Sequence, residues 1–447
     1  MYTFTVLGDT HFVREESHYK ALHGQPGGAT ELTDLPRNSW FTREVTPRVL
    51  ETVKEQKPDF VLHTGDIIPG HCDATDGQLA EMAMGLQMLD QIQVPVYFSF
   101  GSHDGILNVK NDNALKELVL PRLSRLLNQS LDKSYYAFSR FGCRFISLDY
   151  NIWDDTQRYF LESELAACPK DMFTIVFGHP PVCAIARPFF TKENYCRDVG
   201  ALFAKYKVHA YFCGHTHNHA ASIHRFGDYE VPQLMSTPLA YPESQVIPLA
   251  DVRPILPAEE VCRFGWGYLE DCLPGWWQVT VNDNALIANW YVLNRGLQGS
   301  LRIPKRGEAE FLQIPHYPST RGALPALDSI KNARLRIAGL SKSKIEDLTI
   351  NGMEVETDLL PVYFDSRQFI SLPKEMIPLI RQENTVTLRL ASGSIGALVL
   401  ELSLTDGSTR RSTVTNYYTH ETAYSNALPQ FFSPMPEESV SFRLNFA

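Results

Sequence analysis

The sequence predicts an α/β domain followed by a smaller, all-β sandwich domain. Up to about residue 230, short continuous apolar runs alternate with helix-like stretches, which is typical of a largely parallel sheet covered on both faces. After about residue 320, alternating runs are separated by turn residues, which is typical of a β-sandwich. The length of 447 residues also favours two domains over one.

Six apolar runs of the first domain are expected to be buried strands, because they are short, continuous and bounded by turn residues. They span 2–8, 59–65, 94–101, 143–150, 173–178 and 208–214. The stretches between them favour helices, which are expected at 42–56, 77–92, 113–128, 156–167 and 197–207. Residues 276–293 form two further predicted strands around a turn at Asn282–Asn284, and they complete an expected domain of residues 1–297.

Three long irregular segments interrupt this first domain, at 12–40, 182–196 and 240–275. Loops of this length in a compact domain are usually functional or disordered. Two of them directly follow the polar residues described below, so we expect them at the rim of any site.

The rest of the chain is predicted to be a linker and a separate β-sandwich. Residues 298–319 are rich in Pro, Gly and Arg, which is typical of a linker. Within 320–447, the pair Asn351-Gly352 is a strong hairpin signal. The expected strands there span 333–340, 345–356, 369–373, 385–390, 397–408 and 439–446.

Composition excludes several classes of protein. The formal net charge of −10 argues against a nucleic-acid scaffold, which needs a basic surface. No apolar run approaches the ~20 residues of a membrane span, and the chain begins in a strand pattern without a signal-peptide core. The eight cysteines lack CxxC spacing, and Cys143 and Cys213 fall within apolar runs. We therefore expect free thiols in a reducing compartment and a cytoplasmic protein.

Aspartate and histidine residues follow a glycine at the ends of five of the predicted strands. Because the carboxyl ends of parallel strands meet at one edge of a sheet, these side chains are expected to converge on one cleft. Asp and His without Cys suit Mn, Fe or Zn, and the set is too rich in nitrogen for Mg or Ca. His63 lies within a strand and is interpreted as a packed residue. The converging residues are Asp9, His11, Asp66, His103, Asp104, His179, His215 and His217.

The order of these motifs resembles the calcineurin-like metallophosphoesterases. The family order D-x-H, GD, GNH[D/E], GH, GHxH corresponds here to GDTH, GD, GSHD, GHPP and GHTH, across residues 8–217. The resemblance implies a four-layer α/β/β/α sandwich and two metal ions, which together would polarise a phosphoryl oxygen and hold a hydroxide for in-line attack.

The resemblance also implies a role for each residue. The first metal would be held by Asp9, His11 and His217, the second by His179 and His215, and Asp66 would bridge them. His103 would protonate the leaving oxygen or steady the transition state, with Asp104 orienting it. Ser102 occupies the place of the family's asparagine ligand, and its weaker hydroxyl donor predicts a weakly held second metal.

These motifs predict a metal-dependent phosphoester hydrolase acting on a small or mid-sized substrate. Phosphodiester cleavage is favoured over phosphomonoester cleavage, because His103 can protonate a poor leaving group. The alternative, favoured by Ser102, is an inactive scaffold or binding protein. The stretch LTINGMEVE and the TVTLRL strand are similar to galactose-binding-like sandwiches, which implies either glycan contact or packing by the C-terminal domain.

Overall fold

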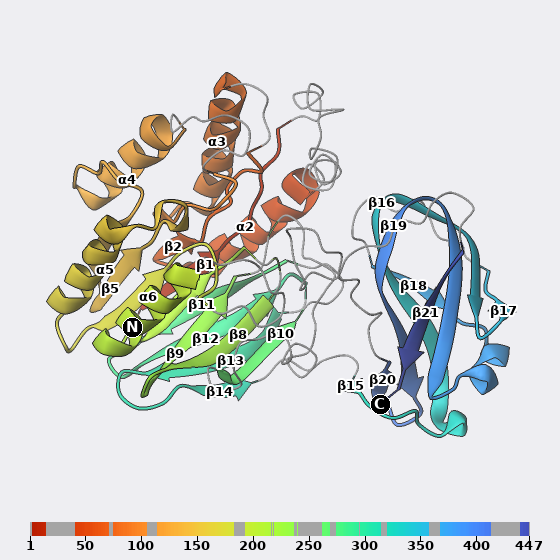
Figure 1. The fold of residues 1–447 in the computed structure, drawn as a ribbon. Helices are drawn as coiled ribbons and strands as arrows, with labels where there is room; N and C mark the ends of the chain where they lie inside the picture. Colours follow the sequence, from red (N-terminus) through yellow and green to blue (C-terminus); the bar gives the residue numbers. More distant parts are fainter. Residues whose placement is uncertain are drawn as a thin grey trace. The chain divides into compact units, whose positions relative to one another are not determined.

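The computed structural model forms two compact units (Figure 1). The first unit comprises Met1–Leu269 and Leu273–Pro315, and the second comprises Glu270–Cys272 and His316–Ala447. The structure describes residues 2–14, 41–70, 75–104, 114–182, 193–215, 217, 219–236, 239, 262–268, 274–294, 296–313, 320–356, 367–412 and 439–446. Most of the three long segments predicted at the rim therefore lies outside the described residues.

The first unit contains two seven-stranded mixed sheets. One sheet has the order β14-β13-β12-β11-β1-β2-β3, in which β1, β2 and β3 are parallel. Its strands are β1 (Tyr2–Leu7), β2 (Phe60–His63), β3 (Val96–Phe98), β11 (Gly275–Val281), β12 (Ala285–Val292), β13 (Gly296–Pro304) and β14 (Glu310–Gln313).

The second sheet has the order β10-β8-β9-β7-β6-β5-β4, in which β5, β6, β7 and β9 are parallel. Its strands are β4 (Tyr136–Arg140), β5 (Cys143–Ser147), β6 (Phe173–Phe177), β7 (Ala210–Cys213), β8 (His219–Phe226), β9 (Tyr229–Met235) and β10 (Cys262–Tyr268). The six strands expected from the apolar runs are thus divided equally between two sheets instead of sharing one.

The two sheets face each other across a layer of aromatic side chains. The ring of Phe4 on β1 lies 5.5 Å from that of Phe145 on β5 and 5.9 Å from that of Phe212 on β7. Phe60 on β2 also reaches Phe145, at 5.4 Å. This layer explains why the runs are continuously apolar: one face of each strand meets the other sheet, and the opposite face meets helices.

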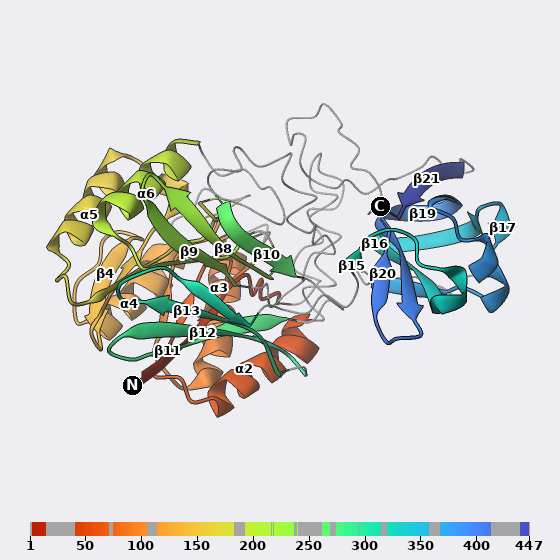
Figure 2. The same cartoon turned by 90° about the horizontal axis from the view of Figure 1, so that it is seen from below.

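Helices complete a four-layer α/β/β/α sandwich, which confirms the fold class (Figure 2). Leu161 of α5 and Val199 of α6 share a buried cluster with Val176 of β6, so these helices cover the second sheet. Beside the first sheet, Gln56 at the end of α2 accepts a hydrogen bond from the indole of Trp276 on β11, at 2.8 Å. The helices are α2 (Thr46–Glu55), α3 (Thr75–Leu89), α4 (Leu120–Leu127), α5 (Asp155–Ala167) and α6 (Glu193–Tyr206), with shorter turns η2 (Phe41–Val45), η3 (Asp90–Ile92), η4 (Leu115–Val119) and η5 (Tyr150–Ile152).

The predicted linker at 298–319 is wrong for most of its length. Residues 296–304 form β13, which pairs with β12, and residues 310–313 form β14 at the sheet edge. Leu301 and Ile303 alternate with the partly exposed Arg302 and are almost completely buried. The Pro, Gly and Arg content concealed this two-residue alternation, which is the signal for a strand buried on one face.

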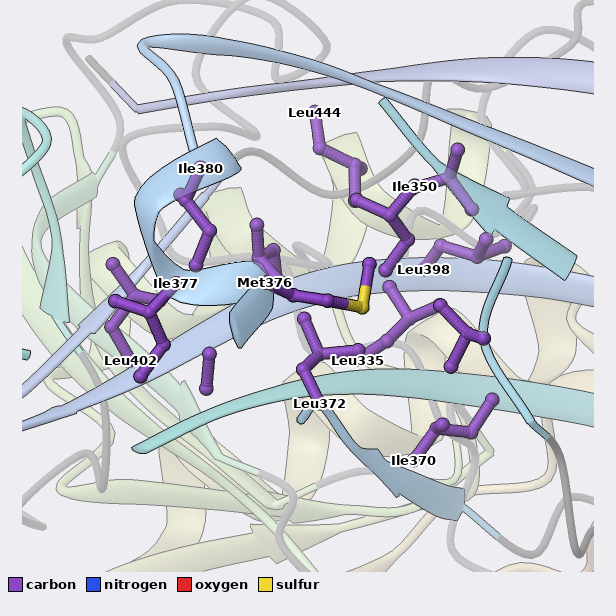
Figure 3. Packing of buried hydrophobic residues seen from close by; sticks show 14 of the residues in the cluster. Leu335, Ile350, Ile370, Leu372, Met376, Ile377, Ile380, Leu398, Leu402 and Leu444 are labelled. Atoms are coloured by element: carbon purple, nitrogen blue, oxygen red, sulfur yellow. The ribbon is translucent and has the colours of Figure 1, made fainter. Parts of the chain in front are cut away.

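The second unit is an all-β structure with its own apolar core (Figure 3). Its sheet has the order β15-β20-β19-β16-β17, with β18 paired to β16 and β21 paired to β19. The hairpin at Asn351-Gly352 forms as expected, with Thr349 opposite Glu354. The elements are β15 (Thr320–Arg321), η6 (Leu327–Ser329), β16 (Ile330–Ile350), β17 (Met353–Glu354), β18 (Arg367–Ser371), η7 (Lys374–Leu379), β19 (Glu383–Leu404), β20 (Thr409–Arg411) and β21 (Ser439–Asn445).

Four strands of this unit that were expected to be separate are joined in pairs to form two long, irregular strands. β16 spans the expected strands at 333–340 and 345–356 up to Ile350, and β19 spans those at 385–390 and 397–408 up to Leu404. The two long strands pair with repeated shifts of register. Turn-forming residues between the apolar runs therefore produce bulges here and do not reverse the chain.

Candidate metal centre

The candidate site lies where strands of both sheets end. Asp9 and His11 follow β1, Asp66 follows β2, His179 follows β6, and His215 and His217 follow β7. Five of these six residues have the left-handed backbone conformation, the exception being His179: φ is 49° at Asp9, 40° at His11, 55° at Asp66, 75° at His215 and 53° at His217. Non-glycine residues adopt it at a cost of about 1–3 kcal/mol each, typically where the surrounding structure enforces a functional geometry.

One group of candidate ligands consists of Asp9, His11, Asp66 and His217, all buried. Nε2 of His11 lies 3.2 Å from Nε2 of His217 and 3.6 Å from Oδ2 of Asp66. Nε2 of His217 lies 3.4 Å from Oδ1 of Asp9. The side chains of Asp9, His11 and His217 therefore converge with that of Asp66 on one point, and they come from the ends of β1, β2 and β7.

A second group consists of Asp66, His179 and His215. Nε2 of His179 lies 3.1 Å from Oδ2 of Asp66 and 3.0 Å from Nδ1 of His215. Nδ1 of His179 lies 3.0 Å from the carbonyl oxygen of Thr64, which can only accept, so Nδ1 donates and Nε2 is left to face the group. The backbone N–H of His215 donates to Asp9 at 3.0 Å, which joins the two groups.

Asp66 is shared by both groups, and its surroundings test whether metal ions fit. Its Oδ1 accepts from the backbone N–H of His103 at 2.8 Å, whereas its buried Oδ2 has no hydrogen-bond partner among the described residues. That oxygen faces the Nε2 atoms of His11 and His179. A buried carboxylate oxygen among imidazole nitrogens has the donor chemistry of a shared ligand to transition metals, so the residues present fit two ions.

Electrostatics keep the shared carboxylate charged. Burial alone would raise the pKa of Asp66, but the surrounding imidazoles, His179 first, hold it well below its usual range. Burial lowers the pKa of His11 and His215, which favours the neutral imidazoles that bind metals. Burial also raises the pKa of Asp9 to about 7 in the metal-free protein.

His103 reaches the site from the turn after β3 and is partly exposed. Its Nδ1 lies 2.8 Å from the carbonyl oxygen of Pro69, which can only accept, so Nδ1 carries hydrogen. Its Nε2 lies 4.0 Å from Oδ2 of Asp66. The nitrogen able to exchange a proton with a substrate therefore faces the carboxylate that both groups share.

Asp104 binds backbone groups of two turns, and its role in orienting His103 stays a prediction. Its buried carboxylate accepts backbone hydrogen bonds from Asp66 and Ile67, both at 2.8 Å, and from Gly101 at 3.0 Å. The imidazole of His103 is contacted by the carbonyl oxygen of Pro69. Because its two oxygens accept hydrogen bonds from these N–H groups, Asp104 holds the turn after β2 against the turn after β3. Ser102 is partly exposed between Gly101 and His103, and its metal contact stays a prediction.

Two residues near the site were not predicted. The side chain of Asn151 donates to the carbonyl of Gly101 at 2.9 Å, and the buried Asp149 accepts from the backbone N–H of Asn151 at 2.9 Å. The sequence signal for them was Asp149, an acidic residue directly after the largely apolar run at 143–148. His63 is absent from both ligand groups: its Nδ1 accepts from the N–H of Gly65, and its Nε2 lies 3.2 Å from Oγ1 of Thr10.

The fold and the site together define a class: an α/β/β/α sandwich whose strand ends carry a candidate dinuclear metal centre. Residues 2–219 match the model of the calcineurin-like phosphoesterase family. These residues make the first unit a calcineurin-like metallophosphoesterase domain. Among curated proteins, none matches the chain.

Solved structures give more distant likenesses. The purple acid phosphatase PPD1 from yellow lupin (Lupinus luteus) is 14% identical with a TM-score of 0.44, and the match covers 68% of this chain and 53% of that one. A dimetal phosphatase from Danio rerio is 13% identical with a TM-score of 0.45, covering 70% and 98%. PhoD is 12% identical with a TM-score of 0.48, covering 70% and 72%. The chain thus spans about half the length of the lupin protein, and likenesses this distant define no activity.

Proposed function

We propose that this protein hydrolyses small or mid-sized phosphoesters with two metal ions, and that phosphodiesters are preferred. The observation that carries the proposal is the sharing of the buried Asp66 by two groups of candidate ligands. Asp9, His11 and His217 would hold one ion, His179 and His215 the other, and Asp66 both. When bound, two such ions polarise a phosphoryl oxygen and activate water for in-line attack.

The protein's own side chains supply the remaining chemistry. His103 presents Nε2 toward the shared carboxylate while Nδ1 is held by the Pro69 carbonyl. A protonated His103 can give its Nε2 proton to the leaving oxygen as the ester bond breaks. Protonation matters most when the leaving group is an alkoxide, which leaves poorly without a proton. This supports the preference for diesters.

Hydrolysis of two model substrates tests the proposal. The metal-free protein would be loaded with Mn, Fe, Co or Zn and assayed with bis-p-nitrophenyl phosphate and p-nitrophenyl phosphate. We expect turnover of both esters, faster for the diester, and loss of turnover in Asp66→Asn, because the shared carboxylate is removed. Turnover that is equal in the variant would show that the activity does not arise at this centre.

The alternative function is a scaffold that retains the fold without turnover. Ser102 favours it, because a hydroxyl is a weaker ligand than a carboxamide oxygen. If no metal supports turnover of either ester while calorimetry still detects metal binding, the scaffold replaces the hydrolase.

Location and the role of the second unit also remain predictions. Among the described residues, Cys143, Cys168 and Cys213 are free thiols, which supports the proposed cytoplasmic location. No described helix has both the length and the apolar character of a membrane span. Cell fractionation tests the location, and a glycan array tests whether the second unit contacts glycans.

A further inference from the structure

Two buried hydroxyl groups connect the two sheets of the first unit beside the strand ends that carry the candidate ligands. Oγ1 of Thr64 lies 2.7 Å from Oγ of Ser236, and both side chains are completely buried. Thr64 directly follows β2 of the first sheet, and Ser236 directly follows β9 of the second. This hydroxyl pair therefore joins the end of one sheet to the end of the other.

The backbone packs closely around the hydroxyl pair. A Cβ atom at Gly8 would lie 2.1 Å from Oγ1 of Thr64 and 2.4 Å from Oγ of Ser236. A Cβ atom at Gly214 would lie 2.9 Å from Oγ1 of Thr64. Each of these glycines directly precedes a candidate ligand in the sequence. The hydroxyl pair is thus held against the backbone that leads into the site from both sheets.

The hydrogen bonds of the pair have a definite direction. Oγ of Ser236 lies 3.0 Å from the carbonyl oxygen of Cys213, the last residue of β7, and a carbonyl oxygen can only accept. Ser236 therefore donates to Cys213, and the hydroxyl of Thr64 donates to Ser236. Through these two bonds, Thr64 is attached to the strand end that is followed by His215.

The backbone of Thr64 contacts a candidate ligand of the second ion. Its carbonyl oxygen lies 3.0 Å from Nδ1 of His179, which therefore carries hydrogen. The next residue, Gly65, has a φ of 102°, and a Cβ atom there would lie 2.9 Å from the same Nδ1. The opposite nitrogen, Nε2, lies 3.1 Å from Oδ2 of Asp66. The backbone at Thr64 and Gly65 thus sets the orientation of this imidazole.

We propose that Thr64 and Ser236 are positioning residues for the second metal ion. The hydroxyl pair fixes Thr64 against the second sheet. The fixed carbonyl of Thr64 then keeps hydrogen on Nδ1 of His179 and leaves Nε2 directed at the shared carboxylate. This inference rests on the proposed function, because it takes His179 as a ligand of the second ion. In this assignment neither hydroxyl contacts an ion or the substrate.

The first test removes the hydroxyl of Thr64 and measures metal affinity by calorimetric titration of the metal-free protein with zinc. Thr64→Val keeps the shape of the side chain and should weaken the second ion by about 10–100-fold, the usual loss when a residue that supports a ligand is replaced. The first ion should lose less. Thr64→Ser keeps the hydroxyl and should bind both ions like wild type. Equal losses for both ions in Thr64→Val, or a Ser variant as weak as the Val variant, would overturn the inference.

Further variants separate positioning from general damage to the fold. Thr5→Val removes another completely buried hydroxyl of the first sheet, one that has no hydrogen-bond partner among the described residues, and should leave both affinities unchanged. Ser236→Ala should weaken the second ion as Thr64→Val does. The double variant should be no weaker than either single one, because both changes remove the same contact. Losses that multiply in the double variant would give the two hydroxyls independent roles and overturn the inference.

A final measurement needs neither metal nor substrate. In the metal-free protein, spectra of ¹⁵N-labelled histidine report whether the Nδ1–H of His179 is protected from exchange with solvent, with His179→Ala giving the assignment. We expect a protected signal in wild type, Thr64→Ser and Thr5→Val, and its loss in Thr64→Val. A wild type without this signal, or an unchanged signal in Thr64→Val, would overturn the inference. The expected signals in a protein that binds no zinc would overturn only the proposed function.

Discussion

Replacing His103 by alanine separates proton donation from metal binding at the scale of a single residue. His103 belongs to neither group of candidate ligands, so the metal content of the purified protein should stay unchanged. Turnover of diphenyl phosphate should fall by ~10²–10⁴, the usual loss for a general acid. Metal analysis alongside kinetics makes the comparison, and loss of an ion in the variant would show that His103 is itself a ligand.

Residue 102 is expected to affect the affinity for the second metal ion only. We expect Ser102→Asn to tighten the second metal by providing a carbonyl oxygen, and to leave the first metal unchanged, because Asp9, His11 and His217 are untouched. Calorimetric titration of the metal-free protein resolves the two steps. A change confined to the first step would show that residue 102 faces the other group, and Ser102→Ala provides the matched control.

The buried His63 is expected to make the stability of the metal-free protein depend on pH. Burial lowers the pKa of His63 to about 3, against 6.5 for an ordinary histidine. The unfolded chain therefore binds the proton first, and this residue's contribution is complete above pH 6.5 and is lost as pH falls toward 3. Between pH 7 and pH 5 the loss is about 2 kcal/mol. Urea unfolding at both pH values should show a smaller decline in His63→Gln, and equal declines would contradict the assignment.

At the scale of elements, β13 provides a direct test of the corrected linker. Leu301 is completely buried on β13, whereas the adjacent Arg302 is partly exposed and paired with Glu310 at 3.1 Å. Leu301→Ala should reduce the free energy of unfolding of the first unit by about 2–5 kcal/mol. Arg302→Ala should cost no more than about 1 kcal/mol. If both variants lose an equally small amount of unfolding free energy in a denaturant titration, these residues would behave as a linker and not as a packed strand.

The same scale shows where sequence reasoning works and where it stops. Strands buried on both faces were predictable, because β1, β2, β3, β6 and β7 are continuous apolar runs that end in Asp or His. Their division between two sheets depends on contacts such as Phe4 with Phe145, which link residues distant in sequence. Likewise, the motif identified the turn containing Asp104, but only the fold shows which backbone N–H groups occupy its carboxylate.

At the scale of the whole molecule, the two cores predict separable units. The apolar cluster of the second unit is built from residues between Ile330 and Phe446. Every candidate ligand lies in the first unit. A chain ending after residue 315 should therefore keep the metal affinity and the turnover of the full-length protein. Calorimetry and the diester assay make the comparison, and a truncated chain that folds but binds no metal would make the second unit part of the site.

The left-handed backbone at Asp9, His11, Asp66, His215 and His217 has a consequence for the life of the protein in a cell. The metal-free chain carries the cost of these conformations without the bonds that a metal ion would add. An ion that binds only the folded chain adds about 2.7 kcal/mol at a concentration one hundred times its Kd. Chains made during metal scarcity would then be unfolded more often and degraded first. The abundance of the protein, and not only its catalytic rate, would thereby follow the supply of metal.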